Sequence, residues 1–186
     1  MATSIRRRRH DPERRQRIID AAIDIARERG IDALSHRAVA AAADVPLGST
    51  TYHFAGLDDL LVAALDQANN AWLDGLEEWE RALPPDADLA AELAALIERT
   101  VAGDRQQVTL EYELYVAALR HERLRPLAAG CVDRVAELLA RRTPDPATAR
   151  ALAALTDGLM LQLLLTGRRA DRTELRELFA RCCPEL

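Results

Sequence analysis

Residues 34–54 read LSHRAVAAAADVPLGSTTYHF and contain two short helical segments separated by a tight break. Ser35 is a suitable N-cap for a helix that runs to about Ala43, because its side chain can accept a hydrogen bond from the first turn. The tripeptide Asp44-Val45-Pro46 should end that helix, since the residue before a proline avoids helical backbone. A second short helix is then expected from Pro46 to Phe54.

A longer helix is expected immediately upstream. Asp11 would be its N-cap, Pro12 its first residue and Gly30 its stop. Apolar residues such as Ile18 and Ala22 recur within it at helical spacing. A supporting helix followed by two short helices joined by a tight turn predicts a helix-turn-helix, although two-helix corners that bind no DNA also exist.

The charge is distributed unevenly along the chain, whose formal net charge is −5. Residues 1–56 hold ten Arg against seven acidic residues, whereas residues 57–186 hold fifteen Arg against 23 acidic residues. A basic head on an acidic body is the pattern expected when one end of a protein meets a polyanion. The alternative for Arg6 to Arg9 is a merely solvated tail.

The remaining sequence also has the composition and punctuation of helices. Ala and Leu dominate, aromatic residues make up only 4% of the chain, and all 25 cationic side chains are Arg. No segment shows the period-2 alternation of a strand. We therefore expect an all-α fold of about nine helices. Beyond the head, the expected ranges are 58–83, with Asp58 as N-cap, 88–102, 104–121, 124–142, 148–166 and 172–182.

Three segments together resemble the DNA-binding head of the TetR family of bacterial repressors: Leu34–Ala40, the run Val45–Phe54 that ends in Tyr-His-Phe, and Asp58–Leu61. The resemblance covers roughly residues 12–65, and beyond that point it is one of architecture only. It implies a flexible basic arm over residues 1–10, a three-helix helix-turn-helix head over 11–56, and a helical effector-binding and dimerisation body over 57–186.

The same resemblance implies that the second and third helices contact DNA. Gly48 would let the backbone approach the duplex closely, and Arg37 can bind guanine through two parallel hydrogen bonds. Hydroxyl groups can bind phosphates or base edges. For Tyr52 and Phe54 the alternative is core packing. The predicted DNA-binding set is Arg14, Ser35, His36, Arg37, Leu47, Gly48, Ser49, Thr50, Thr51, Tyr52 and His53.

The chain departs from the family pattern at two positions. Thr51 stands where members commonly carry an aromatic residue, and Leu57 where many carry a basic one. Both departures remove a usual phosphate contact. Arg14, Arg15 and the arginines of the N-terminal arm could compensate, which would make the affinity for DNA fall steeply with salt.

The stretch LMLQLLL, residues 159–165, is apolar nearly all round. Both faces of this helix should therefore be covered, one by the body and the other by a partner chain. A homodimer is also what two half-sites of a palindromic duplex require, and the family pairs its last two helices. A fully internal helix of a monomer is the alternative. The predicted interface residues are Leu159, Leu163, Thr166, Leu175 and Phe179.

A pocket for an unidentified small-molecule effector would be lined by apolar residues with a few polar groups among them. Asp157 is the clearest anomaly, because a carboxylate among apolar turns needs a partner, and a buried pair with an Arg is the alternative to a ligand. A cationic or hydrogen-bond-donating ligand is favoured, although Arg120 or Arg134 could reverse that preference. The predicted ligand-binding set is Trp72, Trp79, Glu111, Tyr112, Tyr115, Asp157 and Met160, with His121, Cys131 and Gln162 as further candidates.

Other classes of function lack their sequence signatures. Cys131 and the adjacent Cys182 and Cys183 form no zinc-ligand pattern, so no metal site or cofactor is expected. No nucleophile–base pair or phosphate-binding glycine loop indicates an enzyme, and no catalytic residue is assigned. No apolar run approaches the length of a membrane span, so no membrane partner is expected and the location should be cytoplasmic.

The sequence therefore predicts a one-component transcriptional regulator, in the first place a repressor. It would bind double-stranded operator DNA of palindromic sequence as a homodimer and be released by a small-molecule effector. The alternative is a helix-turn-helix regulator without such an effector, either constitutive or sensing thiol oxidation through Cys182 and Cys183.

Overall fold

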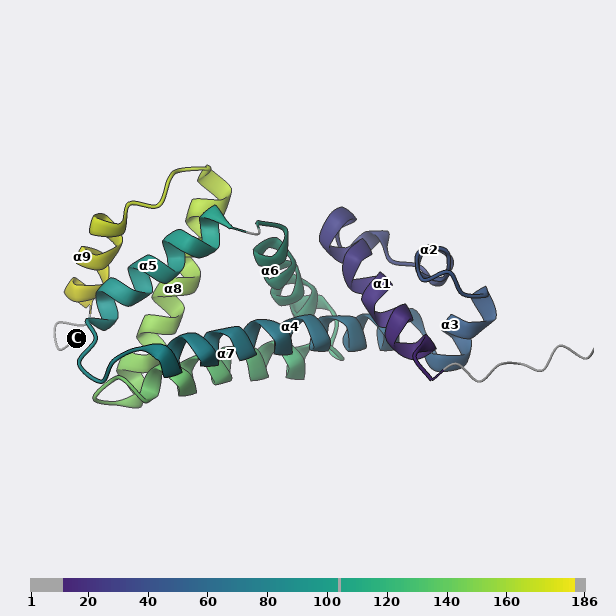
Figure 1. Ribbon diagram of the computed structural model, residues 1–186, viewed down its shortest axis with the longest axis horizontal. Helices are drawn as coiled ribbons and strands as arrows, with labels where there is room; N and C mark the ends of the chain where they lie inside the picture. The colour runs from purple at the N-terminus through teal and green to yellow at the C-terminus, as the bar shows by residue number, and fades with distance from the viewer. Residues whose placement is uncertain (1–11, 104, 183–186) are drawn as a thin grey trace, which may run out of the picture. The chain divides into compact units, whose positions relative to one another are not determined.

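The computed structural model describes residues 12–103 and 105–182. Over these residues the chain forms helices and no strand, so the prediction of an all-α fold is confirmed (Figure 1). The helices are α1 Arg14–Arg29, the short 3-10 helix η1 Ile31–Ala33, α2 His36–Ala42, α3 Leu47–His53, α4 Leu57–Ala82, α5 Leu89–Ala102, α6 Arg105–Arg120, α7 Arg125–Ala140, α8 Pro146–Thr166 and α9 Arg172–Cys182. The basic arm predicted over residues 1–10 lies outside the described residues.

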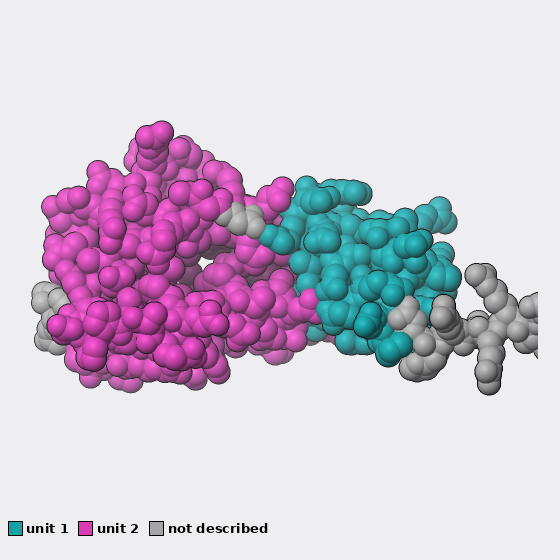
Figure 2. Space-filling model, in the orientation of Figure 1, with its two compact units in different colours: residues 1–64 teal, residues 65–186 magenta. Residues whose placement is uncertain are grey.

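The chain divides into two compact units, residues 1–64 and residues 65–186, so the division falls inside α4 (Figure 2). In the first unit α1 contacts both α2 and α3. The α1 residues Ile18 and Ala22 are fully buried, as are Val39 of α2 and Leu60 of α4. Burial of this apolar face is what holds the short helices α2 and α3 against α1, because a helix of seven residues is not stable alone.

The turn between α2 and α3 has the geometry of a helix-turn-helix. The Ser35 side chain caps α2 by accepting a hydrogen bond of 3.1 Å from the backbone N–H of Ala38, as the sequence predicted. Asp44 has φ of 50°. This left-handed conformation is one that Asp tolerates better than most residues, and it reverses the chain between the two helices. Pro46 then precedes the first residue of α3.

Two predicted helix starts are wrong by a few residues. Helix α1 begins at Arg14, so Pro12 is not its first residue, and its N-cap is Glu13, whose side chain makes no capping bond. The proposed N-cap Asp11 lies outside the described residues. Helix α4 begins at Leu57, which puts Asp58 inside the first turn. A carboxylate is stabilised there by the helix dipole without having to be the cap.

Helix α8 begins earlier than predicted, at Pro146 rather than Thr148. The side chain of Asp145 accepts hydrogen bonds from the backbone N–H groups of Ala147 and Thr148, at 2.7 and 3.1 Å. Proline at the first helical position lacks only an N–H that would have had no partner. The Asp145-Pro146 pair is thus a complete start signal in itself.

The second unit has its own apolar core, in which α5 packs against α9 and α7 packs against α8 (Figure 1). Its most buried side chains include Leu93 and Ile97 of α5, Leu152 of α8 and Phe179 of α9. Helix α8 is long and apolar enough to cross a membrane, judged by length and composition alone, a test that the core helices of soluble proteins also pass.

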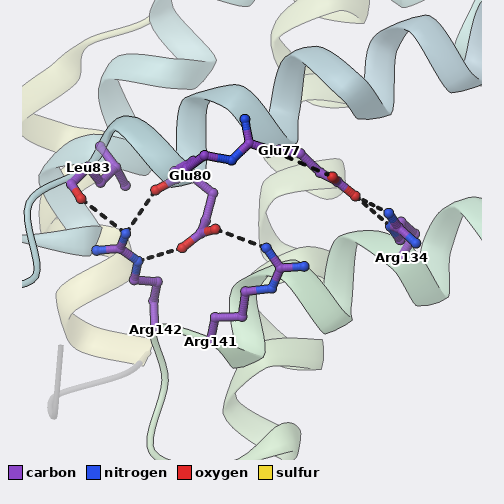
Figure 3. A network of polar contacts seen from close by, with 7 residues as sticks. Glu77, Glu80, Leu83, Arg134, Arg141 and Arg142 are labelled. Atoms are coloured by element: carbon purple, nitrogen blue, oxygen red, sulfur yellow. Dashed lines mark hydrogen bonds and ion pairs between the residues drawn. The ribbon is translucent and has the colours of Figure 1, made fainter.

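Polar contacts fix the C-terminal end of α4 against the end of α7 (Figure 3). The carboxylate of Glu80, a residue that is only 6% exposed, accepts hydrogen bonds from Arg142 Nε at 2.7 Å and Arg141 Nη1 at 3.2 Å. Arg142 also donates to the backbone carbonyls of Glu80 and Leu83. The last carbonyls of a helix have no partner within it, so Arg142 closes the end of α4. One turn earlier, Glu77 pairs with Arg134.

Candidate nucleic-acid interface and ligand pocket

One face of α3 is turned to solvent and carries most of the predicted DNA-binding residues of that helix. Leu47, Gly48, Thr51 and Tyr52 are all exposed, and Tyr52 is 84% exposed. They occupy two adjacent i, i+4 rows and therefore share one face. For Tyr52, the alternative of core packing is excluded, whereas Phe54 is a core residue at 3% exposure.

The opposite face of α3 points into the head, which corrects two predicted DNA contacts. Thr50 is fully buried and its hydroxyl donates to the carbonyl of Leu47 at 2.8 Å, and Ser49 is 9% exposed. Helical periodicity turns two of every four residues of this run inward, so a continuous stretch cannot all contact DNA. Ser35 is exposed, but its hydroxyl caps α2.

The rest of the predicted DNA-binding residues lie on the head in different environments. Arg37 is exposed near the start of α2, and Arg14 is partly buried at the start of α1. His36 is partly buried, and its Nδ1 has no hydrogen-bond partner. The ring of His53 packs edge-on against that of Tyr52, with 5.1 Å between centroids. A ring contact of this kind restricts both side chains at the end of the exposed face.

The second unit contains an apolar pocket of about 460 Å³, counting the part open to solvent. The pocket is lined by Trp72, Leu76 and Trp79 of α4, Leu93, Leu96 and Thr100 of α5, Val135 and Leu139 of α7, and Thr156, Asp157 and Met160 of α8. It is largely apolar with a few polar groups, as small-molecule sites are.

Two buried polar atoms of the pocket wall have no hydrogen-bond partner: Nε1 of Trp79 and Oγ1 of Thr156. Thr156 is only 8% exposed. Burying a donor or a hydroxyl without a partner costs free energy, and a ligand that forms the missing hydrogen bond removes that cost. The pocket therefore offers a hydrogen-bond donor at Trp79, and a hydroxyl at Thr156 that can donate or accept.

Asp157 brings a carboxylate to the pocket, and burial raises its pKa to about 6. Within the described part of the chain no ion pair or hydrogen bond involves this carboxylate, so the predicted alternative of a buried pair with an Arg is not found. Arg134 pairs with Glu77 instead, and Arg120 is exposed at the end of α6. Asp157 therefore faces the pocket without a cationic partner among the described residues.

Four of the predicted ligand-binding residues line this pocket, namely Trp72, Trp79, Asp157 and Met160. The other three, Glu111, Tyr112 and Tyr115, are not in its wall. The hydroxyl of Tyr112 donates to the backbone carbonyl of Asp157 at 2.9 Å. Burial first, and then the charge of Asp157, raise the pKa of Glu111 to about 8, against the opposing effect of a hydrogen bond from Gln107.

A thiol and a phenol lie next to these acids. The hydroxyl of Tyr115 and the Sγ atom of Cys131 are 3.5 Å apart. Burial raises the pKa of both the Tyr115 phenol and the Cys131 thiol, so neither ionises near neutral pH. The further candidates His121 and Gln162 are exposed and line no part of the pocket.

Sequence reasoning missed most of the apolar pocket wall, including Leu76, Leu96 and Val135, and also Thr156. Leucine and valine at helical spacing are typical of any core face. Only the packing of four helices decides which of these side chains line the pocket and which pack against each other. A threonine within the apolar helix α8 was a signal that could have been read.

The structure corrects the predicted dimer interface. Leu175 and Phe179 are 4% and 0% exposed, because α9 packs them into the core of its own unit. Leu159 and Leu163 are partly buried against the same core, and Thr166 is exposed. The exposed apolar side chains of α8 are instead Leu161 and Leu165, at 39% and 77%.

Nothing in the described residues groups three or more His, Cys, Asp or Glu side chains as a metal site would. The thiol-sensing alternative rests on Cys183, which lies outside the described residues, and on Cys182, whose side chain is not described.

Two segments of the chain match established family profiles. Residues 18–64 match the profile of bacterial regulatory proteins of the tetR family. Residues 84–185 match that of the tetracyclin repressor-like C-terminal domain.

Solved structures and curated proteins agree with these matches. The multidrug binding protein EbrR complexed with ethidium is 57% identical, with a TM-score of 0.83, over 93% of this chain and 99% of that one. EbrR complexed with proflavin is 56% identical, with a TM-score of 0.79, over 91% of this chain and 99% of that one. The nicotine-responsive transcriptional repressor HdnoR of Paenarthrobacter nicotinovorans is 24% identical over 81% of this chain and 83% of its own. The transcriptional regulator BetI 2 of Chromohalobacter salexigens is 29% identical over 90% of this chain and 86% of its own.

Proposed function

The chain belongs to the TetR family of bacterial regulators and is a ligand-responsive transcriptional regulator rather than an enzyme. On this premise we propose that it represses transcription by binding a palindromic operator as a homodimer. We propose further that an aromatic cation releases it from the operator. The proposal places the protein in the cytoplasm with no membrane partner. The observation that carries it is the exposed face of α3 in a basic head.

The DNA contacts are assigned to that face and to Arg37. Gly48 allows close approach of the backbone, Thr51 and Tyr52 offer hydroxyls to phosphates, and Leu47 can contact a thymine methyl. Arg37, at the start of α2, is exposed and has five N–H donors for a guanine or a phosphate. Arg14, His36 and His53 flank this set as phosphate ligands.

The dimer interface is assigned to the C-terminal half of α8. Leu161 and Leu165 lie four residues apart on one helix face and are exposed in the single chain. Covering them with the same face of a second copy gives a twofold contact, which matches the twofold symmetry of a palindromic operator. Leu159 and Leu163 pack against the core on the other side of α8, so this assignment leaves them out, together with Thr166.

The effector class follows from the chemistry of the pocket. Trp72 and Trp79 provide aromatic surface, while Asp157 provides a negative charge that no basic side chain of the described residues neutralises. A cation beside a carboxylate and an aromatic ring is stabilised by both. The complexes of EbrR with ethidium and proflavin support the same chemistry. Binding of such a ligand and binding of DNA would weaken each other by the same factor.

Replacing Gly48 with Ala tests the assigned DNA face separately from the fold. A Cβ atom at Gly48 would meet nothing within 4 Å, so the substitution fits the chain and should stabilise α3 by about 0.5–1 kcal/mol. Against DNA the added methyl should block close approach and lower operator affinity by tenfold or more. The measurement is a titration at fixed salt of a duplex selected from a random library by the wild-type protein.

Gly130→Ala, on α7, is the matched control, since a Cβ there also meets nothing within 4 Å. It should leave operator affinity unchanged. Equal operator affinity for Gly48→Ala and the wild type would remove α3 from the DNA interface.

Replacing Leu165 with Glu tests the dimer interface. In a single chain this side chain is 77% exposed, so the new carboxylate should not disturb the fold. In the proposed dimer it would bury two like charges face to face, which is strongly unfavourable. We expect a folded monomer with lost operator binding, measured by sedimentation and circular dichroism.

Leu119→Glu is the matched control, because Leu119 on α6 is also 77% exposed. It should leave the oligomeric state as in the wild type. A Leu165→Glu protein that remains dimeric would show that the subunits meet elsewhere.

A further inference from the structure

Trp79 carries a hydrogen-bond donor that the fold leaves unused. Its indole Nε1 is buried and has no hydrogen-bond partner among the described residues, although Trp79 lines the pocket. An indole nitrogen can only donate, and the N–H of a buried tryptophan usually finds an acceptor within its own protein. A ligand in the pocket can bring the acceptor that is missing here.

The turn of α4 that carries Trp79 is held in place by its neighbours. Glu77 and Glu80 lie on either side of Trp79 in the sequence, and both are anchored to the end of α7 (Figure 3). Glu77 pairs with Arg134, and the Glu80 carboxylate accepts a hydrogen bond of 2.7 Å from Arg142 Nε. These ion pairs fix the backbone on which the indole sits. A donor that is in position before the ligand arrives costs little ordering entropy on binding.

Thr156 brings a second unused polar group to the pocket, from α8. Other helical threonines of the chain donate their hydroxyl to a carbonyl of their own helix. Thr109 donates to the Arg105 carbonyl at 2.9 Å, and Thr166 donates to that of Gln162 at 2.8 Å. Threonine divides between two rotamers in helices because one of them allows this bond. Thr156 is only 8% exposed, yet within the described part of the chain its Oγ1 makes no such bond.

The pocket-facing turn of α8 is fixed as well, because the Tyr112 hydroxyl donates to the backbone carbonyl of Asp157 at 2.9 Å. Thr156, Asp157 and Met160 share one side of this helix, and all three line the pocket. The Asp157 carboxylate accepts hydrogen bonds, whereas the groups of Trp79 and Thr156 can donate them. The pocket wall therefore holds polar groups of both kinds.

We propose, building on the aromatic cation proposed above as the effector, that Trp79 and Thr156 select among such cations for those that also carry an uncharged hydrogen-bond acceptor, such as a carbonyl oxygen. The positive charge lies beside Asp157, and the acceptor meets the Trp79 N–H or the Thr156 hydroxyl. A cation without an acceptor still binds, but it leaves both buried groups unmatched. The selection is therefore a ratio of affinities between cations of equal charge.

Matched pairs of 1-methylquinolinium cations are the probes. One member of each pair carries an acetyl group and the other an isopropenyl group at the same ring position, so a carbonyl oxygen replaces a CH2 group of similar size. Calorimetric titration of the full-length protein measures both affinities, for pairs substituted at ring positions 3, 6 and 7. At one of these positions or more, we expect the acetyl member to bind about tenfold more tightly than its partner.

Trp79→Phe and Thr156→Val each remove one donor and keep the pocket wall apolar. In the variant that lacks the donor used by the carbonyl, the tenfold preference should fall to about twofold or less. Trp72→Phe and Thr100→Val are the matched controls, because they make the same substitutions at pocket residues without a buried, unpartnered group. Each control should change the affinities of both members alike and keep their ratio.

Thr156→Val also has an expected effect on the ligand-free protein. Because it removes a buried hydroxyl without a partner, it should raise the midpoint of thermal unfolding, by about 2–4 °C. A lower midpoint would show that the hydroxyl is already satisfied within the fold, and it would remove Thr156 from the selection.

The outcomes separate this selection from the proposed effector. A preference below threefold at every ring position, or one that survives in both variants, overturns the selection and leaves the aromatic cation standing. If neither ethidium nor any quinolinium binds, the aromatic cation fails, and the uncharged pair 2-acetylnaphthalene and 2-isopropenylnaphthalene decides the selection. A tenfold preference for the acetyl member that is lost in Trp79→Phe or Thr156→Val keeps the selection, and its absence overturns it.

Discussion

Phe179→Ala should lower the free energy of unfolding by about 3–5 kcal/mol, the largest effect expected of any single truncation in the body. The Phe179 ring is fully buried where α9 packs on α5, so its removal leaves a cavity in the core. Urea unfolding followed by circular dichroism measures the change.

The neighbouring substitution Glu177→Ala, on the exposed side of α9, is the control and should change stability by less than about 0.5 kcal/mol. If Phe179 were an interface residue, its effect would shrink by up to about 2.7 kcal/mol on raising the protein concentration a hundredfold. That result would contradict its assignment to the core of the chain.

Arg142→Ala should destabilise the protein by about 3 kcal/mol, because it leaves the buried carboxylate of Glu80 and the last carbonyls of α4 without their main donor. Arg141→Ala is the control: Arg141 contacts the same carboxylate at 3.2 Å, but its side chain is 55% exposed, so its loss should cost about 1 kcal/mol or less. Equal losses for the two variants would contradict the central role of Arg142.

The same variant has a defined pH dependence. Hydrogen bonds from Arg142 and then from Arg141 hold the pKa of Glu80 below its usual range. A carboxyl whose pKa is depressed by folding contributes stability above its unfolded pKa and loses it as the pH falls through the folded pKa. The difference between wild type and Arg142→Ala should therefore be full at pH 7 and shrink as the pH falls toward 3. A constant difference over that range would show that the Glu80 charge is not involved.

Local signals in the sequence were sufficient where neighbouring residues alone determine the backbone. Ser35 caps α2, and Asp44 and Pro46 separate it from α3, because a cap, a left-handed turn and a proline act within a few residues. The errors at Pro12, Asp58 and Thr148 are of the same local kind. Each placed the start of a helix a few residues away from the first helical residue in the structure.

The candidate sites were predicted only in part, because exposure depends on what packs against a helix. The run from Leu47 to His53 was correctly assigned to α3, yet packing on α1 turns Thr50 inward and leaves Tyr52 exposed. In the body, Asp157 was identified from its apolar neighbours, but the leucines that line the pocket resemble any other core leucines.

The sequence by itself determined the all-α class, the two-helix turn and the presence of unmatched acidic residues in an apolar body. Only the tertiary structure decided that Phe179 is core, that Leu165 is exposed, and that the Tyr112 hydroxyl reaches the backbone of Asp157. The physical reason is one of range. Capping, turn formation and helical periodicity act over a few consecutive residues, whereas burial and the pKa of a carboxyl depend on side chains brought together from distant helices.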